Sequence, residues 1–208
     1  MFREAKVDDL AIRLATDLDG TFEELVRRHA DRLYSVALRL TGDPRDAEEV
    51  AQDGFVRAYR ALRTYDAPRI RELQLRPWLT TIVLNLARNR RRRDARRLRI
   101  DRSLDADRST SIEGPEAADG RAGSTDAADP AEHAARRDEA ARWAALVRDL
   151  PPRYRIPIVL RYVDDLTIAE IAAVLGSPEG TVKTRLHRGL RLLRAAYLGS
   201  GLEQELSA

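Results

Sequence analysis

Residues 166–194 read LTIAEIAAVLGSPEGTVKTRLHRGLRLLR, and this stretch decides the fold of the C-terminal half of the chain. Thr167, followed three positions later by Glu170, forms a capping-box pattern that is typical of a helix start. Gly176 suits the left-handed residue that commonly ends a helix. Because a second amphipathic pattern begins within a few residues, the stretch predicts a helix-turn-helix.

The second helix of this pair, about residues 178–197, is expected to begin at a Ser177 cap with Pro178 in its first turn. It carries five basic residues and no acidic residue between Thr181 and Tyr197. Its apolar residues recur at steps of three and four, so the basic side chains lie off that face, where a recognition helix meets the major groove. A solvated surface helix is the alternative, but the preceding turn favours DNA binding. The candidate DNA contacts are Ser177, Glu179, Thr181, Lys183, Thr184, Arg185, Arg188 and Arg191.

The charges of the 208-residue chain are unevenly distributed, although they nearly cancel to a formal net charge of +3. Residues 88–99 hold eight arginines and one aspartate, whereas residues 101–132 hold nine acidic residues and three arginines. The acidic stretch has almost no large apolar side chains, so it cannot offset the entropy of ordering and is expected to be a disordered linker. Only two of the 37 basic residues are lysine. Codon usage can explain the large total number of arginines, but it does not explain why they cluster in the sequence.

Several classes of protein are excluded by composition. The chain has no cysteine, so disulfide frameworks, thiol nucleophiles and cysteine-ligated zinc are excluded. Its three histidines are scattered without metal-ligand spacing, and no convergent set of catalytic side chains stands out. No apolar run is long enough to cross a membrane, and residues 1–9 lack a signal core. We therefore expect a cytoplasmic protein that is not an enzyme and uses no cofactor or metal.

The N-terminal half also has helical patterns. A capping-box pattern at Thr21 and Glu24 predicts a helix of about 20 residues, and Gly42 and Pro44 mark its end and the start of the next helix. That next helix, about residues 45–63, has one apolar and one polar face. Pro77 is expected in the first turn of a third helix that leads into the arginine run. The fold class is therefore all-α, with two small helical domains joined by the linker.

At this point the residues resemble a known family, the extracytoplasmic-function (ECF) sigma factors of bacterial RNA polymerase. Residues 150–193, from the LPPRYR motif through the helix-turn-helix, are similar to the promoter-reading domain of that family. The DAEEVAQD motif at 46–53, followed by Phe55, resembles its polymerase-docking surface. The PWL motif at 77–79, with the polar residues that follow it up to Arg88, resembles its promoter-melting helix. The resemblance covers about residues 20–99 and 135–197.

The resemblance implies a division of the chain and a role for each part. Residues 20–99 would form a region-2-like domain for polymerase docking and minus-ten recognition, and residues 135–198 a region-4-like domain for the minus-thirty-five element. The remaining parts would be an N-terminal extension at 1–19, the linker at 100–134 and a tail at 199–208. The implied partners are the clamp and flap regions of core RNA polymerase and promoter DNA, and an anti-sigma factor is a further candidate.

The resemblance also assigns residues to each role. The polar face of helix 45–63 would dock on the polymerase through Asp46, Glu48, Glu49, Gln52, Asp53 and Arg57, although a solvated face would look the same. Melted bases are held by stacking and by pockets, and the arginine run would neutralise phosphates. Trp78 can stack on a base, but its spacing is more typical of a core residue. The candidates for the minus-ten element and melting are Arg63, Tyr65, Arg71, Arg76, Trp78, Asn85, Arg88 and Arg92.

Three features depart from the family pattern. Pro157 lies inside an expected helix, and it should kink or shorten that helix because it lacks a backbone donor. The loop at 66–77 is long, and its apolar residues Ile70, Leu73 and Leu75 are spaced as though part of it were helical. Gly189 lies in the recognition helix, where it costs about 1 kcal/mol relative to alanine but permits close packing.

A stand-alone helix-turn-helix regulator is the alternative function, and the docking and melting motifs argue against it. An enzyme with an added DNA-binding domain is disfavoured.

Overall fold

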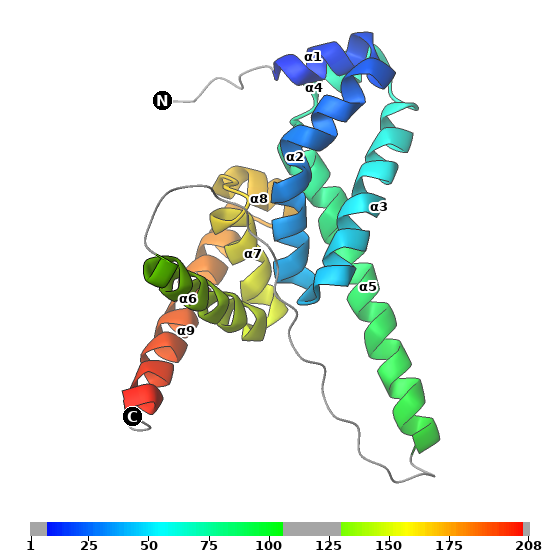
Figure 1. Ribbon diagram of the computed structural model, residues 1–208. Coiled ribbons are helices and arrows are strands. Elements are labelled where there is room, and N and C mark those ends of the chain that lie inside the picture. The colour runs from blue at the N-terminus through cyan, green and yellow to red at the C-terminus, as the bar shows by residue number, and fades with distance from the viewer. Residues whose placement is uncertain (1–7, 106–129, 206–208) are drawn as a thin grey trace.

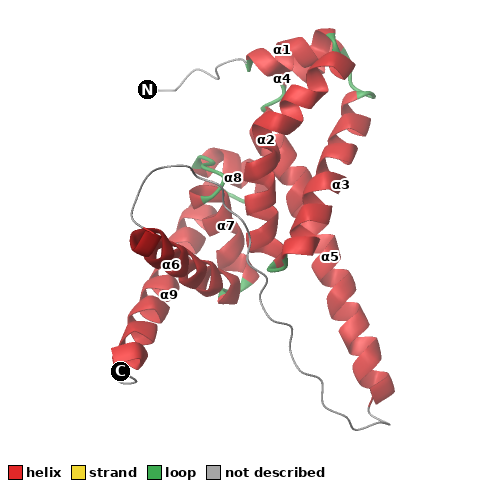
Figure 2. Ribbon diagram, in the orientation of Figure 1, coloured by secondary structure: helices red, strands yellow, loops and turns green. Residues whose placement is uncertain are grey.

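The computed structural model describes residues 8–105 and 130–205, and within these ranges the chain forms α-helices and connecting turns without a strand (Figure 2). This confirms the all-α fold class. The helices are α1 Asp9–Thr16, α2 Leu18–Thr41, α3 Pro44–Leu62, α4 Ala67–Glu72, α5 Leu75–Asp105, α6 Pro130–Asp149, α7 Pro152–Tyr162, α8 Ile168–Leu175 and α9 Glu179–Glu205.

The first half of the chain is built on α2, α3 and α5, which run alongside one another (Figure 1). Their facing sides bury Leu33, Val36, Val50, Ala58 and Val83 almost completely. These residues recur at helical steps, so each helix hides one apolar stripe and leaves its polar face in solvent. Helices α1 and α4 pack on each other across one end of this group (Figure 1).

The start of the first long helix differs from the sequence prediction. Helix α2 begins at Leu18, and the side chain of Asp17 caps it by accepting a hydrogen bond from the Gly20 backbone at 2.9 Å. Thr21 lies inside the helix and is nearly buried, so it does not act as the cap. The preceding helix α1 was not predicted, yet it buries Leu10 and Leu14.

The predicted boundaries of α3 are right to within one residue, because its start is signalled locally. The Asp43 side chain accepts a hydrogen bond from the Asp46 backbone at 2.9 Å, and Pro44 occupies the first turn. Gly42 adopts the left-handed conformation, with a φ of 85°, that ends α2. The expected helical piece in the following loop is α4, which is capped by Asp66.

Helices α5 and α6 both reach into the range that was expected to be a disordered linker. Helix α5 continues through the arginine run to Asp105, and α6 begins at Pro130. The prediction of a linker over 100–134 is therefore wrong at both of its ends. Because α5 is continuous, the arginine run extends the same helix that carries the PWL motif at 77–79. The rest of the predicted linker, residues 106–129, lies outside the described residues.

The second half of the chain packs α7 against α9, with α8 and α6 beside them (Figure 1). Helix α7 continues through Pro157, so the expected shortening does not occur, and Pro157 is itself buried. Gly189 is also buried, and a Cβ atom there would lie 2.6 Å from Cδ1 of Ile158. The predicted close packing at Gly189 is therefore confirmed, because a Cβ atom there would overlap Ile158 and crowd Tyr154 unless α7 side chains shifted.

Candidate nucleic-acid and polymerase interfaces

Local signals fix both ends of α8, the first helix of the helix-turn-helix. The Thr167 hydroxyl accepts from the Glu170 backbone at 3.2 Å, and the Glu170 carboxylate accepts from the Thr167 backbone at 2.7 Å. This confirms the predicted capping box. Gly176 has a φ of 58°, in the left-handed region, as its place after α8 predicts.

The start of α9 differs from the prediction in one detail. The helix begins at Glu179, so Pro178 precedes the first turn rather than occupying it. The Ser177 hydroxyl lies 3.4 Å from the Leu175 carbonyl and turns back toward α8, so Ser177 does not cap α9 as predicted. The proline still sets the exit direction of the turn, because the backbone of Thr181 donates to its carbonyl at 2.9 Å.

Helix α9 separates an apolar face from a basic one. Val182, Leu186 and Leu193 are buried. The predicted DNA contacts Glu179, Lys183, Thr184, Arg188 and Arg191 are exposed, whereas Ser177, Thr181 and Arg185 are half-buried. The structure therefore places the basic side chains on the outer face of a helix-turn-helix, which is the geometry of a recognition helix.

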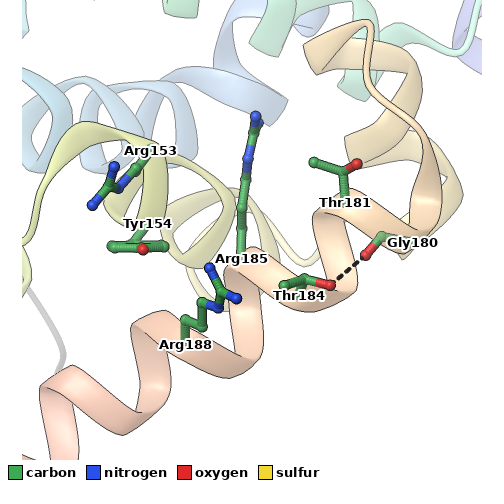
Figure 3. A pocket seen from close by; sticks show the side chains of 7 residues that line it. All are labelled: Arg153, Tyr154, Gly180, Thr181, Thr184, Arg185 and Arg188. Atoms are coloured by element: carbon green, nitrogen blue, oxygen red, sulfur yellow. Dashed lines mark hydrogen bonds between the residues drawn. The ribbon is translucent and has the colours of Figure 1, made fainter.

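A cavity of about 340 Å³ lies on this face of α9 (Figure 3). Thr181, Thr184, Arg185 and Arg188 line it, and the Thr184 hydroxyl donates to the Gly180 carbonyl at 2.9 Å. Its lining holds three arginines and no acidic residue. Neither Arg185 nor Arg188 has an ion pair in the described part of the chain, so no carboxylate competes with an anion or a base edge for their guanidinium groups.

The aromatic candidates for the minus-ten element lie together, with Tyr65 in the turn before α4 and Trp78 in the first turns of α5. The rings of Tyr65 and Trp78 are 6.3 Å apart, and the Arg69 guanidinium lies 3.7 Å from the centre of the Tyr65 ring. Trp78 is half-buried and packs against the core, so its stacking on a base stays a prediction. Arg63, which precedes α4, and Arg71, within α4, are both exposed. Arg69, which lies in the same segment as the predicted contacts Arg63 and Arg71, joins this group.

Further along α5, Asn85 and Arg92 are exposed, as expected for side chains that contact DNA. Arg88 is half-buried, and this burial lowers the pKa of its guanidinium, with a smaller contribution from nearby Arg92. A cation in such a place is poorly hydrated, so it gains more from an approaching phosphate than a fully solvated arginine does.

Arg76 does not join the other minus-ten candidates, because it contacts the second half of the chain. Its guanidinium donates to the backbone carbonyls of Asp164 and Asp165, both at 3.3 Å. Asp165 adopts a positive φ of 54°, which is uncommon for a residue with a side chain. The prediction that Arg76 contacts DNA therefore requires that this contact first breaks.

Asp164 is the centre of the contact between the two halves. Its side chain is fully buried and accepts a hydrogen bond of 2.5 Å from the Thr80 hydroxyl of α5. Arg32 of α2 lies 3.8 Å from its other carboxylate oxygen, which accepts no hydrogen bond, and donates to its backbone carbonyl at 2.8 Å. Burial raises the pKa of Asp164 to about 6, against the opposing effects of Thr80, Arg32 and Arg76. Nothing local in the sequence marks Asp164.

The predicted docking residues share the polar face of α3, but two of them are already paired. Arg90 of α5 contacts Asp46 at 2.6 Å and also contacts the Glu49 carboxylate. Gln52 donates a hydrogen bond to Glu48 at 3.2 Å. Glu48, Asp53 and Arg57 are exposed and have no ion pair in the described part of the chain. Arg90 was not predicted to pair with α3, because in the sequence it is one arginine of the run at 88–99.

Within the described residues, no cluster of three histidine or acidic side chains is placed to hold a metal ion. A search of the same residues for a helix both long and apolar enough to cross a bilayer also found none.

Comparisons with known proteins agree with this geometry. Family models described as Sigma-70 region 2 and Sigma-70, region 4 match residues 25–97 and 141–193. The chain is 31% identical over 173 residues to the ECF RNA polymerase sigma factor SigW of Bacillus subtilis, which covers 83% of this chain and 87% of that protein. It is 34% identical over 178 residues to the ECF RNA polymerase sigma factor SigE of Mycolicibacterium smegmatis, covering 84% of this chain and 60% of that one.

A solved structure, that of CnrH in complex with the cytosolic domain of CnrY, matches with a TM-score of 0.61 and 27% identity. The match covers 91% of this chain and 96% of the solved one, so it includes both halves of the fold. Two matched regions in the expected order, together with relatives that align along most of the chain, leave one assignment. The protein belongs to the ECF sigma factors of the sigma-70 family.

Proposed function

We propose that this ECF sigma factor directs core RNA polymerase to promoters by reading the minus-thirty-five element with α9 and the minus-ten element with α4 and α5. The observation that carries the proposal is the basic face of α9, the second helix of the helix-turn-helix, which has no acidic residue between Thr181 and Tyr197 and borders a cavity lined by arginines. The work is done by binding energy, and no catalytic residue is needed.

In the upstream contact, α9 enters the major groove with its N-terminal half. Arg188 and Lys183 are exposed there and are of the residue types that form hydrogen bonds with a guanine edge. Arg191 lies one helical turn further along and is better placed for a phosphate. Thr181, Thr184 and Arg185 complete the surface that faces the groove.

In the downstream contact, the cluster of Tyr65, Arg69 and Trp78 offers flat surfaces for unstacked bases. Asn85, Arg88 and Arg92 follow Trp78 on α5. The arginine run beyond them would neutralise the phosphates of the opened strand. Because α5 is one continuous helix, Trp78 keeps a fixed backbone spacing from Arg88 and Arg92, and Tyr65 and Arg69 join the cluster through their contacts with each other and with Trp78.

The exposed acidic residues of α3 are proposed to dock on the clamp of core polymerase, and the second half to contact its flap. The chain would act in the cytoplasm of a bacterium, where the polymerase and the chromosome are. An anti-sigma factor is a candidate regulator, because the matched structure of CnrH was solved together with the cytosolic domain of CnrY.

The test of this function is run-off transcription with purified protein and core RNA polymerase on a library of genomic fragments. We expect transcripts that start from a small set of promoters and that appear only when the protein is added. If the protein fails to bind core polymerase, or the transcripts show no promoter preference, the proposed function is wrong.

The two halves of the structure must separate before both promoter elements can be bound. The elements are centred about 25 base pairs apart, or about 85 Å at 3.4 Å per step. The chain from Asp164 to Arg188 runs through α8 and the first turns of α9, and its length limits the distance between these two residues to about 50 Å. Asp164 in turn contacts Arg76 in the first half. We therefore expect the contacts of Asp164 with Thr80, Arg32 and Arg76 to break in the transcription complex.

This separation can be measured because the chain contains no cysteine of its own. Fluorophores on the R27C and A195C substitutions, in α2 and α9, should show a fall in energy transfer when core polymerase and promoter DNA are added. A second pair on R27C and R60C, both in the first half, should show no change. Unchanged transfer in the first pair would mean that the closed arrangement persists on the promoter.

Replacing Arg188 with alanine is expected to relax the preference for the minus-thirty-five element. Because a guanine contact is worth about 1–3 kcal/mol, discrimination at one position should fall about 10-fold while affinity for core polymerase stays unchanged. The measurement is transcription from promoters that differ at single upstream positions. Arg60→Ala, an exposed change on α3, is the control and should leave the preference intact.

A further inference from the structure

Two residues at the start of α7, Arg153 and Tyr154, line the same cavity as the basic face of α9. Figure 3 shows their side chains around one opening with those of Arg185 and Arg188. Neither residue belongs to the recognition helix, and neither was among the predicted DNA contacts. The cavity therefore extends the basic face of α9 onto a second helix.

Arg153 is held by its aromatic neighbour and not by an acid. Its guanidinium lies 4.8 Å from the centre of the Tyr154 ring, which is within the range of a cation–π contact. The side chain is exposed, and the described residues offer it no ion pair or hydrogen bond. A guanidinium that is stacked on a ring keeps its N–H donors in one plane and available to a ligand.

Tyr154 is in turn held in place by the close approach of α9. A Cβ atom on Gly189 would lie only 3.2 Å from the Cβ atom of Tyr154, so the two helices pack directly at this point. Tyr154 itself is half-buried. The position of Arg153 relative to Arg188 is therefore set by packing between two helices, which is how rigid binding sites are built.

The chemistry of the cavity selects an anion. Three arginines from two helices surround it, and no carboxylate is present to neutralise them. Arg185 and Arg188 lie on the helix that is proposed to read bases, so the group that reaches Arg153 at the edge of that helix is the sugar–phosphate backbone. The planar donors of arginine match the two free oxygens of a phosphodiester.

We propose that Arg153, stacked on Tyr154, binds one phosphate of the DNA strand that runs along α9 and so sets the register of α9 in the groove. The inference rests on the proposed function, because it requires α9 to bind the minus-thirty-five element. It adds a positioning contact from α7 that carries no base preference of its own.

The test uses the full chain bound to core RNA polymerase and a duplex that carries the minus-thirty-five element of a promoter found by run-off transcription. Arg153→Ala should weaken binding about 5-fold, to the same extent on the native duplex and on single-base variants. The slope of log affinity against log salt should become shallower by about 1. Arg153→Lys keeps the positive charge but lacks the paired planar donors of the guanidinium group. This variant should therefore keep the wild-type salt slope and lose about 2-fold in affinity.

A sharper readout replaces single phosphates of the duplex with neutral methylphosphonates. One position should weaken binding by the wild-type protein and have no effect on Arg153→Ala. The Arg60→Ala variant should respond as the wild type does. The inference is wrong if Arg153→Ala has the wild-type affinity and salt slope, or if its sensitivity to methylphosphonates is unchanged. If the wild-type protein itself does not distinguish the duplex from a scrambled one, the proposed function has failed instead.

Discussion

Replacing both Glu48 and Asp53 with arginine is expected to lower the affinity of this sigma factor for core RNA polymerase by about 100-fold. Both side chains are exposed on α3, and neither has an ion pair in the described part of the chain. If basic groups of the polymerase face them, reversal replaces two attractions with two repulsions. Like charges placed opposite each other at an interface cost several kcal/mol, and 100-fold corresponds to about 3 kcal/mol.

The choice of residues separates docking from folding. Asp46 and Glu49 share the same face, but both contact Arg90, so their reversal would also weaken the packing of α3 on α5. The control is reversal of Glu23 and Asp31, which are exposed on α2 and give the same change in net charge. Affinity is measured by competition against a labelled wild-type protein. Equal losses in both double variants would assign the effect to net charge, and wild-type affinity in the first would remove α3 from the interface.

The elements that the sequence predicts well are those whose signals are local. The start of α3 depends on Asp43 and Pro44, the start of α8 depends on Thr167 and Glu170, and its end depends on Gly176; each of these signals acts within one helical turn. The start of α2 was misplaced because Asp17 and Thr21 are both good caps by residue type. The choice between them depends on α1, which packs its own buried leucines and leaves the chain to turn at Asp17.

Prediction of the site residues is limited in the same way, because only local signals can be read from the sequence. The basic face of α9 is visible in the sequence because it lies on a single helix. The partners of Arg76 and Arg90 are not visible, because they lie 88 and 41 residues away along the chain. An arginine that is paired with a distant carbonyl and one that is free for DNA have the same appearance in a sequence. Only the packing of the two halves distinguishes Arg76 from Arg71.

The contact between the halves should depend on pH through Asp164. The folded-state pKa of Asp164 is raised to about 6, above its ordinary value of 3.8, because the carboxyl group is buried. Between these two values the folded protein binds more protons than the unfolded one, so this group's contribution to stability is present at low pH and is lost as the pH rises through 6. From pH 4.5 to pH 7 the free energy of unfolding should lose about 2 kcal/mol through Asp164 alone.

His29 near this contact also has a shifted pKa, so the comparison must be made with a variant. The charges of Arg32 and Arg76 oppose the effect of burial on Asp164 and that of Glu170 adds to it, whereas half-buried His29 has a pKa lowered by burial and so opposes Asp164. Asp164→Asn is neutral at every pH and still offers Thr80 an oxygen as acceptor. The difference in unfolding free energy between the wild type and this variant isolates the carboxyl group, because the contribution of His29 cancels.

The measurement is urea unfolding at several pH values, followed by tryptophan fluorescence, since Trp78 lies two residues from Thr80. We expect the wild type to lose stability relative to Asp164→Asn as the pH rises from 4.5 to 7. A constant difference would show that Asp164 is ionised in the folded state throughout this range. The arginines would then hold the carboxylate more strongly than burial opposes it, and the contact between the halves would be an ion pair and not a protonated hydrogen bond.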